Sequence, residues 1–185
     1  MPFDKAYDEM VGGPERGYGN DPNDTGGETI DGISRNNNKS WPGWALIDKA
    51  PVKKYSELIK ISGMKDMIKQ FYYDEYWLKL RCDEIDKIAP NTAGELFEAS
   101  VNCGRKRGVQ FLQRALNILN VNETLYSDLL PDGGLGNKTM NALKTCCRSA
   151  IGCRLLYNCQ NGEQYEFYKS LPKHELYRGW FGRTV

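Results

Sequence analysis

The segment between residues 15 and 29 carries the side chains whose types and spacing could do chemistry. Glu15 lies where a helical pattern is expected to end, and Asp21, Asp24 and Thr29 follow it among glycines. A glycine-rich return can bring these side chains back towards Glu15, because glycine reaches backbone conformations that other residues avoid. Cleavage of a glycosidic bond needs such a set, since one carboxylic acid protonates the leaving oxygen while a second carboxylate stabilises the sugar cation, attacks it or activates water.

Two simpler interpretations apply to the same segment. Asp and Asn are common turn residues, so the acids could cap local backbone amides in a turn-rich loop. A calcium loop is the other alternative, but Asp21 and Asp24 lack the acidic spacing of an EF-hand. The residues alone therefore leave open whether these acids are catalytic or only shape a turn.

The elements that must position this segment are mostly helical. Apolar residues recur at helical spacing from Phe3 to Val11, which predicts a helix just before Glu15. The run Thr29–Ile33 could form a short strand or one arm of a hairpin. Further helices are predicted after Gly63, from a capping box at Thr92 and Glu95, through Phe111–Leu119, from Met140 onward, and through Leu155–Tyr168. The sequence thus predicts a mainly α fold with one small β element near its start.

Composition and charge exclude several classes of protein. A chain of 185 residues and 21.1 kDa corresponds to about one domain, and no apolar run approaches the roughly 18 residues of a membrane helix. The net charge of +1 argues against a nucleic-acid binder, so we expect no nucleic-acid partner and no membrane insertion. Residues 1–34 hold eight acidic and two basic side chains, whereas residues 104–185 hold six acidic and twelve basic ones. This asymmetry suggests either two separate functions or one cleft with an acidic wall and a basic wall.

The first residues and the cysteines of the chain indicate the cellular compartment in which the protein is made. The start of the chain lacks the basic and continuous apolar regions of a signal peptide, so we expect the protein to be cytoplasmic when made. In a reducing compartment the six cysteines are expected to be free, buried thiols. Their spacing is not that of a zinc site and His174 is the single histidine, so we expect no metal and no cofactor.

Several motifs together resemble glycoside hydrolase family 108, the lysozyme-like N-acetylmuramidases of phage endolysins. The resemblance covers nearly the whole chain. It is carried by Glu15-Arg16-Gly17-Tyr18-Gly19-Asn20-Asp21-Pro22-Asn23-Asp24-Thr25-Gly26-Gly27-Glu28-Thr29-Ile30-Asp31-Gly32-Ile33, Trp41-Pro42-Gly43-Trp44, Tyr76-Trp77, Phe97–Gly104, Phe111–Asn117, Asp132–Thr139 and Gly179–Arg183. One departure is Arg16, which stands where the family commonly has glycine and could lower the pKa of Glu15 by its charge.

The resemblance implies a lysozyme-like helical fold with a small β-hairpin near the N-terminus. It maps the family's catalytic Glu onto Glu15, and a further likeness to the Glu-Asp-Thr triad of phage lysozymes makes Asp24 and Thr29 its expected partners. It also implies a lysozyme-like catalytic region over residues 1–108 and a helical peptidoglycan-binding region over residues 109–185, packed on it.

Four further residues are expected to bind substrate. Asp21 is the alternative to Asp24 as the second carboxylate of the catalytic pair. Trp41 and Trp44 lie in a polar segment and are expected to line the cleft, although buried aromatic anchors are the commoner role. Asn102, on a predicted helix, could bond either the loop backbone or a sugar N-acetyl group.

The resemblance implies an N-acetylmuramidase that cleaves the β-1,4 bond between N-acetylmuramic acid and N-acetylglucosamine in peptidoglycan glycan strands. We expect a monomer that reaches the wall after holin-type release or cell lysis. The alternative is a non-catalytic peptidoglycan-binding or secretion-assisting protein on the same scaffold.

Overall fold

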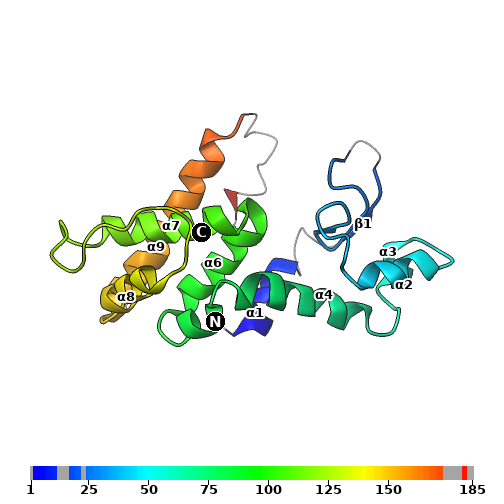
Figure 1. Cartoon of the computed structure of the whole chain (residues 1–185), viewed down its shortest axis with the longest axis horizontal. Helices are drawn as coiled ribbons and strands as arrows, with labels where there is room; N and C mark the ends of the chain where they lie inside the picture. The colour runs from blue at the N-terminus through cyan, green and yellow to red at the C-terminus, as the bar shows by residue number, and fades with distance from the viewer. Residues whose placement is uncertain (1, 12–16, 22–23, 173–180, 183–185) are drawn as a thin grey trace. The chain divides into compact units, whose positions relative to one another are not determined.

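A computed structural model describes residues 2–11, 17–21, 24–172 and 181–182. Helices dominate this part of the chain, and a small antiparallel sheet lies near the N-terminus (Figure 1). The predicted fold class, mainly α with a small β element near the N-terminus, is therefore confirmed. None of the described helices combines the length and the apolar character that a membrane crossing requires.

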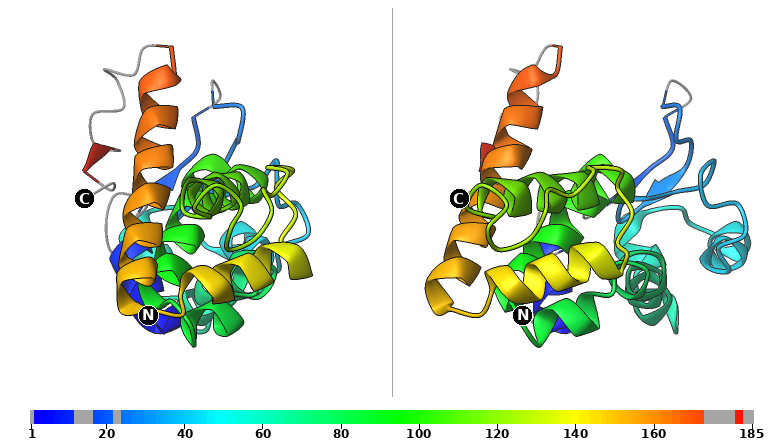
Figure 2. Two further views of the ribbon diagram at one scale, coloured as in Figure 1. Left: turned by 90° about the vertical axis from the view of Figure 1, so that its left-hand side faces the viewer. Right: turned by 60° about the vertical axis from the view of Figure 1, so that its left-hand side comes forward.

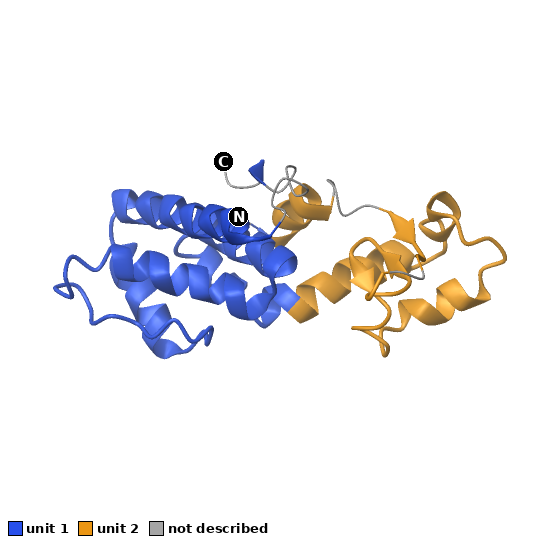
Figure 3. Cartoon of the chain, turned by 90° about the horizontal axis from the view of Figure 1, so that it is seen from above, with its two compact units in different colours: residues 1–2, 76–185 blue, residues 3–75 orange. Residues whose placement is uncertain are grey.

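The chain divides into two compact units (Figure 3). Unit 2 comprises residues 3–75, and unit 1 comprises residues 1–2 and 76–185. The division into a catalytic region up to residue 108 and a binding region from residue 109 is one of function, and it stays a prediction.

Within its described residues, unit 2 holds the small sheet and the helices α1 to α4. The first helix follows the predicted apolar spacing and buries Ala6, Met10 and Val11. A helix also begins after Gly63, as predicted, and Gly63 adopts a left-handed conformation with φ of 81°. The elements are α1 (Phe3–Val11), β1 (Tyr18–Gly19), β2 (Thr29–Ile30), β3 (Ile33–Ser34), α2 (Gly43–Lys49), α3 (Tyr55–Leu58) and α4 (Met64–Tyr72), and a π-helical stretch, η1 (Tyr73–Leu78), follows α4 into unit 1.

The sheet has the strand order β1-β2-β3, and both strand pairs are antiparallel. In the β2–β3 hairpin Ile30 lies opposite Ile33, so Asp31 and Gly32 alone form the turn. Both turn residues have positive φ, 43° for Asp31 and 78° for Gly32. A two-residue turn of this kind matches the right-handed twist of the flanking strands and favours an Asp-Gly pair. The hairpin expected from Thr29–Ile33 is thus present.

Unit 1 is a bundle in which α6 packs against α5, α7 and α9 (Figure 2). Its helices are α5 (Cys82–Asp86), α6 (Pro90–Cys103), α7 (Arg105–Ile118), α8 (Asn137–Cys146) and α9 (Ala150–Ser170). The core contains Trp77, whose ring meets that of Phe97 edge-on at 5.6 Å between centroids. The α6–α7 crossing is close, because a Cβ on Gly108 would lie 2.2 Å from the Ser100 hydroxyl oxygen.

The predicted capping box at Thr92 and Glu95 is wrong. Helix α6 begins two residues earlier, at Pro90, and Thr92 and Glu95 lie buried inside it. Proline is well suited to the first turn of a helix, since its missing N–H has no partner there in any case. The cysteines are all free, but only Cys82 and Cys146 are fully buried, and the other four are partly exposed.

Glu95 is a buried acid on α6. Its Oε1 atom has no hydrogen-bond partner, and burial raises the pKa of its carboxyl well above the ordinary value, to which Glu98 adds by repulsion. The buried amide of Gln160 on α9 likewise makes no hydrogen bond. Such groups cost free energy when buried unpaired, so this part of unit 1 is less stable than an apolar interface of the same area.

Replacing Glu95 with glutamine is expected to stabilise unit 1 at neutral pH. In the unfolded chain a Glu ionises near pH 4.3, whereas folded Glu95 holds its proton to higher pH, so the wild type loses stability as pH rises from about 4 through the raised pKa. Each unit of that rise corresponds to about 1.4 kcal/mol, and glutamine removes the loss. Denaturant unfolding between pH 4 and 8 checks this expectation. Glu166→Gln, whose side chain is 68% exposed, is the control and should show no such pH-dependent gain. An equal gain for Glu95→Gln at every pH would contradict the assignment.

Candidate active site

Glu15 lies outside the described residues, which resume at Gly17. Gly17, two residues downstream, exchanges a pair of hydrogen bonds with Asp31 at the hairpin turn. The Asp31 N–H donates to the Gly17 carbonyl oxygen at 2.8 Å, and the Gly17 N–H donates to Oδ1 of Asp31 at 2.9 Å. The hairpin turn therefore anchors the chain next to the predicted general acid.

Asp31 is held from a second side by two tyrosines. The hydroxyl of Tyr55 donates to Oδ2 of Asp31 at 3.2 Å, and the hydroxyl of Tyr72 donates to its carbonyl oxygen at 2.6 Å. Asp31 is only 3% exposed, and Tyr72 is fully buried. These contacts connect the turn to α3 and α4, so the position of Gly17 depends on the core of unit 2.

The remaining members of the predicted triad lie in the β1–β2 connection and in β2. Oδ1 of Asp24 accepts a hydrogen bond from the Gly26 N–H at 2.8 Å, and the Asp24 N–H donates to the Asp21 carbonyl oxygen at 3.0 Å. Both aspartates are exposed. The Thr29 hydroxyl donates to the Gly27 carbonyl oxygen at 3.1 Å. Asp24 thus shapes a local turn, as the simpler interpretation expected, and its predicted catalytic role stays a prediction.

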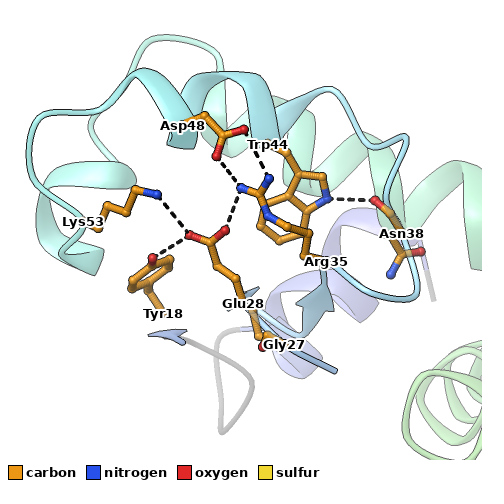
Figure 4. A network of polar contacts seen from close by, with 9 residues as sticks. Tyr18, Gly27, Glu28, Arg35, Asn38, Trp44, Asp48 and Lys53 are labelled. Atoms are coloured by element: carbon orange, nitrogen blue, oxygen red, sulfur yellow. Dashed lines mark hydrogen bonds and ion pairs between the residues drawn. The ribbon is translucent and has the colours of Figure 1, made fainter. Parts of the chain in front are cut away.

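A second acid of this segment, Glu28, is buried in a network of charged groups (Figure 4). It accepts a hydrogen bond from the Tyr18 hydroxyl at 2.6 Å and forms ion pairs with Arg35 at 2.6 Å and Lys53 at 3.8 Å. Arg35 also bonds both carboxylate oxygens of Asp48, at 2.7 and 3.2 Å. Because Asp48 lies on α2, Arg35 connects the buried Glu28 carboxylate of the hairpin to that helix.

Two hydrogen-bond donors of this network, Tyr18 and Arg35, have raised pKa values. Burial, and then the hydrogen bond to Glu28, raise the pKa of Tyr18 to about 12, so Tyr18 stays a hydrogen-bond donor. The Asp48 carboxylate raises the pKa of Arg35, and Glu28 adds to the effect. Glu28 therefore belongs to a network of ion pairs that holds the hairpin.

Trp41 and Trp44 pack edge-on, with ring centroids 5.0 Å apart. Trp44 is 3% exposed, its Nε1–H donates to the Asn38 carbonyl oxygen at 2.8 Å, and the Arg35 guanidinium lies 4.5 Å from its ring centroid. Trp44 is thus a buried anchor of the Glu28 network. Trp41 is 7% exposed and, with Phe71, lines a pocket of about 430 Å³. Substrate contact by either tryptophan stays a prediction.

The glycine between these tryptophans is required by their packing. A Cβ on Gly43 would lie 2.2 Å from Cη2 of Trp41, so no other residue fits without moving the indole. The Trp41-Pro42-Gly43-Trp44 motif therefore has a packing reason: it begins α2 and brings both indoles together.

Asn102 belongs to unit 1, on α6. Its Nδ2 donates to the Glu98 carbonyl oxygen at 3.0 Å and to Oε1 of the same Glu98 side chain. Oε2 of Glu98 accepts from Nε2 of Gln164 on α9 at 2.8 Å. These contacts tie α6 to α9, and the predicted contact of Asn102 with a sugar stays a prediction.

Comparison with known proteins identifies the family. Residues 9–104 match the family described as glycosyl hydrolase 108, and this range is just over half of the chain. The chain belongs to glycosyl hydrolase family 108. Residues 107–185 match a second family, described as a predicted peptidoglycan domain. The resemblance seen in the sequence is therefore confirmed, and the protein is a glycoside hydrolase with peptidoglycan as its partner.

The fold of this hydrolase has a counterpart among solved structures. The structure of Brucella abortus SagA matches with a TM-score of 0.63 over 98% of this chain and 88% of that chain, at 22% sequence identity. At this identity the match shows the fold alone. A comparison with curated protein sequences gave no match.

Three residues that build the hairpin of this family 108 hydrolase were not predicted from its sequence. Asp31, Glu28 and Arg35 make the contacts that hold the β1–β2–β3 sheet in place, yet none was predicted as part of the site. One signal was available: Asp31-Gly32 lies between β-branched residues, which is a strong short-range indication of a hairpin turn. A two-residue turn at Asp31-Gly32 also places Arg35 opposite Glu28 across the hairpin, whereas their partners Lys53 and Asp48 lie beyond any spacing rule.

Proposed function

We propose that this hydrolase is an N-acetylmuramidase that cleaves the β-1,4 bond between N-acetylmuramic acid and N-acetylglucosamine. The observation that carries the proposal is the family match over residues 9–104, a range that contains Glu15 and the whole hairpin. The peptidoglycan domain match over residues 107–185 supports the same polymer as substrate.

Glu15 is the general acid in this proposal. Its neutral form protonates the glycosidic oxygen as the bond breaks, which requires an acid that keeps its proton near the working pH. The paired hydrogen bonds between Gly17 and Asp31 support the role, because they fix the backbone two residues away. Precise placement of an acid relative to the leaving oxygen is a large part of its catalytic effect.

Asp24 acts as base or electrostatic stabiliser, with Asp21 as its rival. Both carboxylates are exposed on the β1–β2 connection, where a glycan strand could reach them. Thr29 orients the attacking water. Because the Thr29 hydroxyl gives its proton to the Gly27 carbonyl oxygen, its own oxygen is left to accept a hydrogen bond from that water.

The proposal extends to the setting in which the enzyme works. It acts as a monomeric endolysin of the phage type, made in the cytoplasm and admitted to the wall by a holin or by lysis. The reaction needs no cofactor, since an acid, a carboxylate and water supply all the protons and the nucleophile.

Mass spectrometry of digested peptidoglycan tests the reaction. Purified sacculi are digested with the full chain, and the released muropeptides are reduced with borohydride before analysis. The expected products carry new reducing ends on muramic acid. New ends on glucosamine, or cut peptides with intact glycan, would contradict the muramidase assignment, as would anhydromuramic ends, which form without water.

The second candidate is a wall-binding protein without hydrolytic activity on the same scaffold. The separate match of residues 107–185 to a peptidoglycan domain favours binding as a function in its own right. Sacculi that retain the protein after sedimentation but release no muropeptides would support this candidate over the muramidase.

A further inference from the structure

Unit 1 contains a pocket that the proposed catalytic roles do not use. Its volume is about 870 Å³, and it lies between the 119–136 connection and helix α8. Figure 2 shows this connection in yellow-green as it leaves α7 and returns to α8. The groups relevant to binding are Tyr126, Ser127, Asn137, Lys138, Asn141 and Thr145. Pockets of this size accommodate ligands of a few hundred Å³, such as one or two sugar residues.

The wall of this pocket is preformed by a row of amide side chains on α7 and on Asn120, two residues past the end of that helix. The row recurs at helical spacing, and each member bonds the 128–134 segment: Gln110 donates to the Pro131 carbonyl oxygen at 3.0 Å, Gln113 to Oδ1 of Asp132 at 2.9 Å, Asn117 to the Leu129 carbonyl oxygen at 2.8 Å, and Asn120 to Oδ1 of Asp128. A segment held in this way needs little ordering when a ligand binds, which favours affinity.

Two further contacts complete the wall. The Leu129 N–H donates to Oδ1 of Asn117 at 2.8 Å, and the Gly133 N–H donates to Oε1 of Gln113 at 2.9 Å. Gly133 has φ of 80°, and a Cβ there would lie 2.7 Å from the Lys106 carbonyl oxygen, so the close approach of the segment to α7 requires glycine.

The charges of the pocket favour a neutral ligand. Its two acids are already engaged, Asp128 by Asn120 and Asp132 by Gln113 and by the Gly134 N–H at 2.7 Å. The exposed groups that remain at α8 are the amides of Asn137 and Asn141, with Lys138 as the cation among the lining residues. Amides pair with hydroxyl and acetamido groups, whereas a stem peptide with several carboxylates would call for more cations.

Apolar surface lies next to these amides. Leu130 lines the pocket and is 77% exposed, and the ring of Tyr126 is fixed by a hydrogen bond from its hydroxyl to the Leu116 carbonyl oxygen at 2.9 Å. Sugar rings and acetyl methyl groups present apolar patches beside polar ones, and mixed walls of this kind match them.

We propose that this pocket binds an N-acetylated amino sugar of the glycan strand and that unit 1 thereby holds the wall polymer. The choice of a peptidoglycan sugar rests on the proposed function. The contacts that would carry recognition are hydrogen bonds from Asn137 and Asn141, with the sugar face against Tyr126 and Leu130.

An NMR titration of the full chain tests the proposal. The ¹⁵N-labelled Glu15→Gln variant, which is expected not to cleave the ligand, is titrated with chitotetraose, a short chain of N-acetylglucosamine. Amide resonances of residues 126–145 are expected to shift. The Asn137→Ala/Asn141→Ala variant, which changes only exposed side chains, should bind about tenfold more weakly or worse, the loss expected for two hydrogen bonds. Asn91→Ala, an exposed amide on α6 outside the pocket, is the matched control and should bind like the parent.

Three results would overturn the proposal: no shifts at residues 126–145, equal affinity after loss of Asn137 and Asn141, or shifts there with a sugar-free stem peptide but not with chitotetraose. Failure of the proposed function is seen separately, as absent muropeptide release by the wild type. The shifts at α8 do not depend on that activity.

Discussion

Replacing Glu15 with glutamine is expected to lower the rate of muropeptide release by a factor of about 100 to 10,000, the range that a positioned general acid contributes. Glutamine has nearly the same shape as glutamic acid but cannot give a proton to the leaving oxygen. The backbone anchor at Gly17 does not involve the Glu15 side chain, so the fold and the binding of sacculi should be retained. The measurement is the initial rate of reducing-end formation on purified sacculi, with sedimentation to check binding.

A matched control lies close by in the sequence. Glu9 is an exposed acid on α1 whose ion pair with Lys5 spans 3.8 Å on the surface. Surface pairs of this kind contribute little, so Glu9→Gln should hydrolyse at the wild-type rate. A Glu15→Gln variant that lyses sacculi as fast as Glu9→Gln would contradict the catalytic assignment. Asp24→Asn and Asp21→Asn, measured separately in the same assay, decide which aspartate is the second carboxylate.

Helices and hairpin were predictable where the signal is local. The spacing of Phe3, Tyr7 and Met10 depends on residues within one or two helical turns, and α1 follows it. The glycine before Met64 likewise marks the start of α4 in both sequence and structure. Where packing decides, prediction failed: Thr92 and Glu95 have the spacing of a capping box, yet they are buried one turn inside α6 because Pro90 starts the helix.

The candidate site was predictable only in part, for the same reason. The acids of the 15–29 segment could be read from residue type and spacing, but which of them is structural depends on distant residues. Glu28 is held by Arg35, which lies opposite it in the hairpin, and by Lys53, which no local pattern links to it. The burial of Trp44 was likewise not evident from its polar sequence surroundings, because it depends on contacts with Arg35 and Asn38. Residue type and spacing identify candidate site residues, whereas the role of each residue depends on its tertiary contacts.

Replacing Asp31 with alanine is expected to have the second largest effect, on stability and on activity together. The side chain accepts hydrogen bonds from the Gly17 N–H and the Tyr55 hydroxyl, and its loss leaves both donors without this partner. Each such loss at a buried site costs about 1–3 kcal/mol. Alanine also fits poorly at φ of 43°, which adds about 1–2 kcal/mol. The free energy of unfolding should therefore fall by several kcal/mol, as measured by denaturant titration.

Asp31→Asn separates the anchoring of Gly17 from a general loss of stability. Asparagine tolerates positive φ and keeps an oxygen that can accept from the Gly17 N–H, so it should restore most of the hydrolysis that alanine loses. Below the unfolding transition the alanine variant is expected to show a reduced kcat with a nearly unchanged KM, because a displaced Gly17 moves the acid and not the bound strand. Asp66→Ala, an exposed acid on α4, serves as the control and should change neither constant. If Asp31→Ala raised KM alone, or if asparagine failed to restore kcat while restoring stability, the turn would serve the fold of unit 2 without placing the catalytic acid.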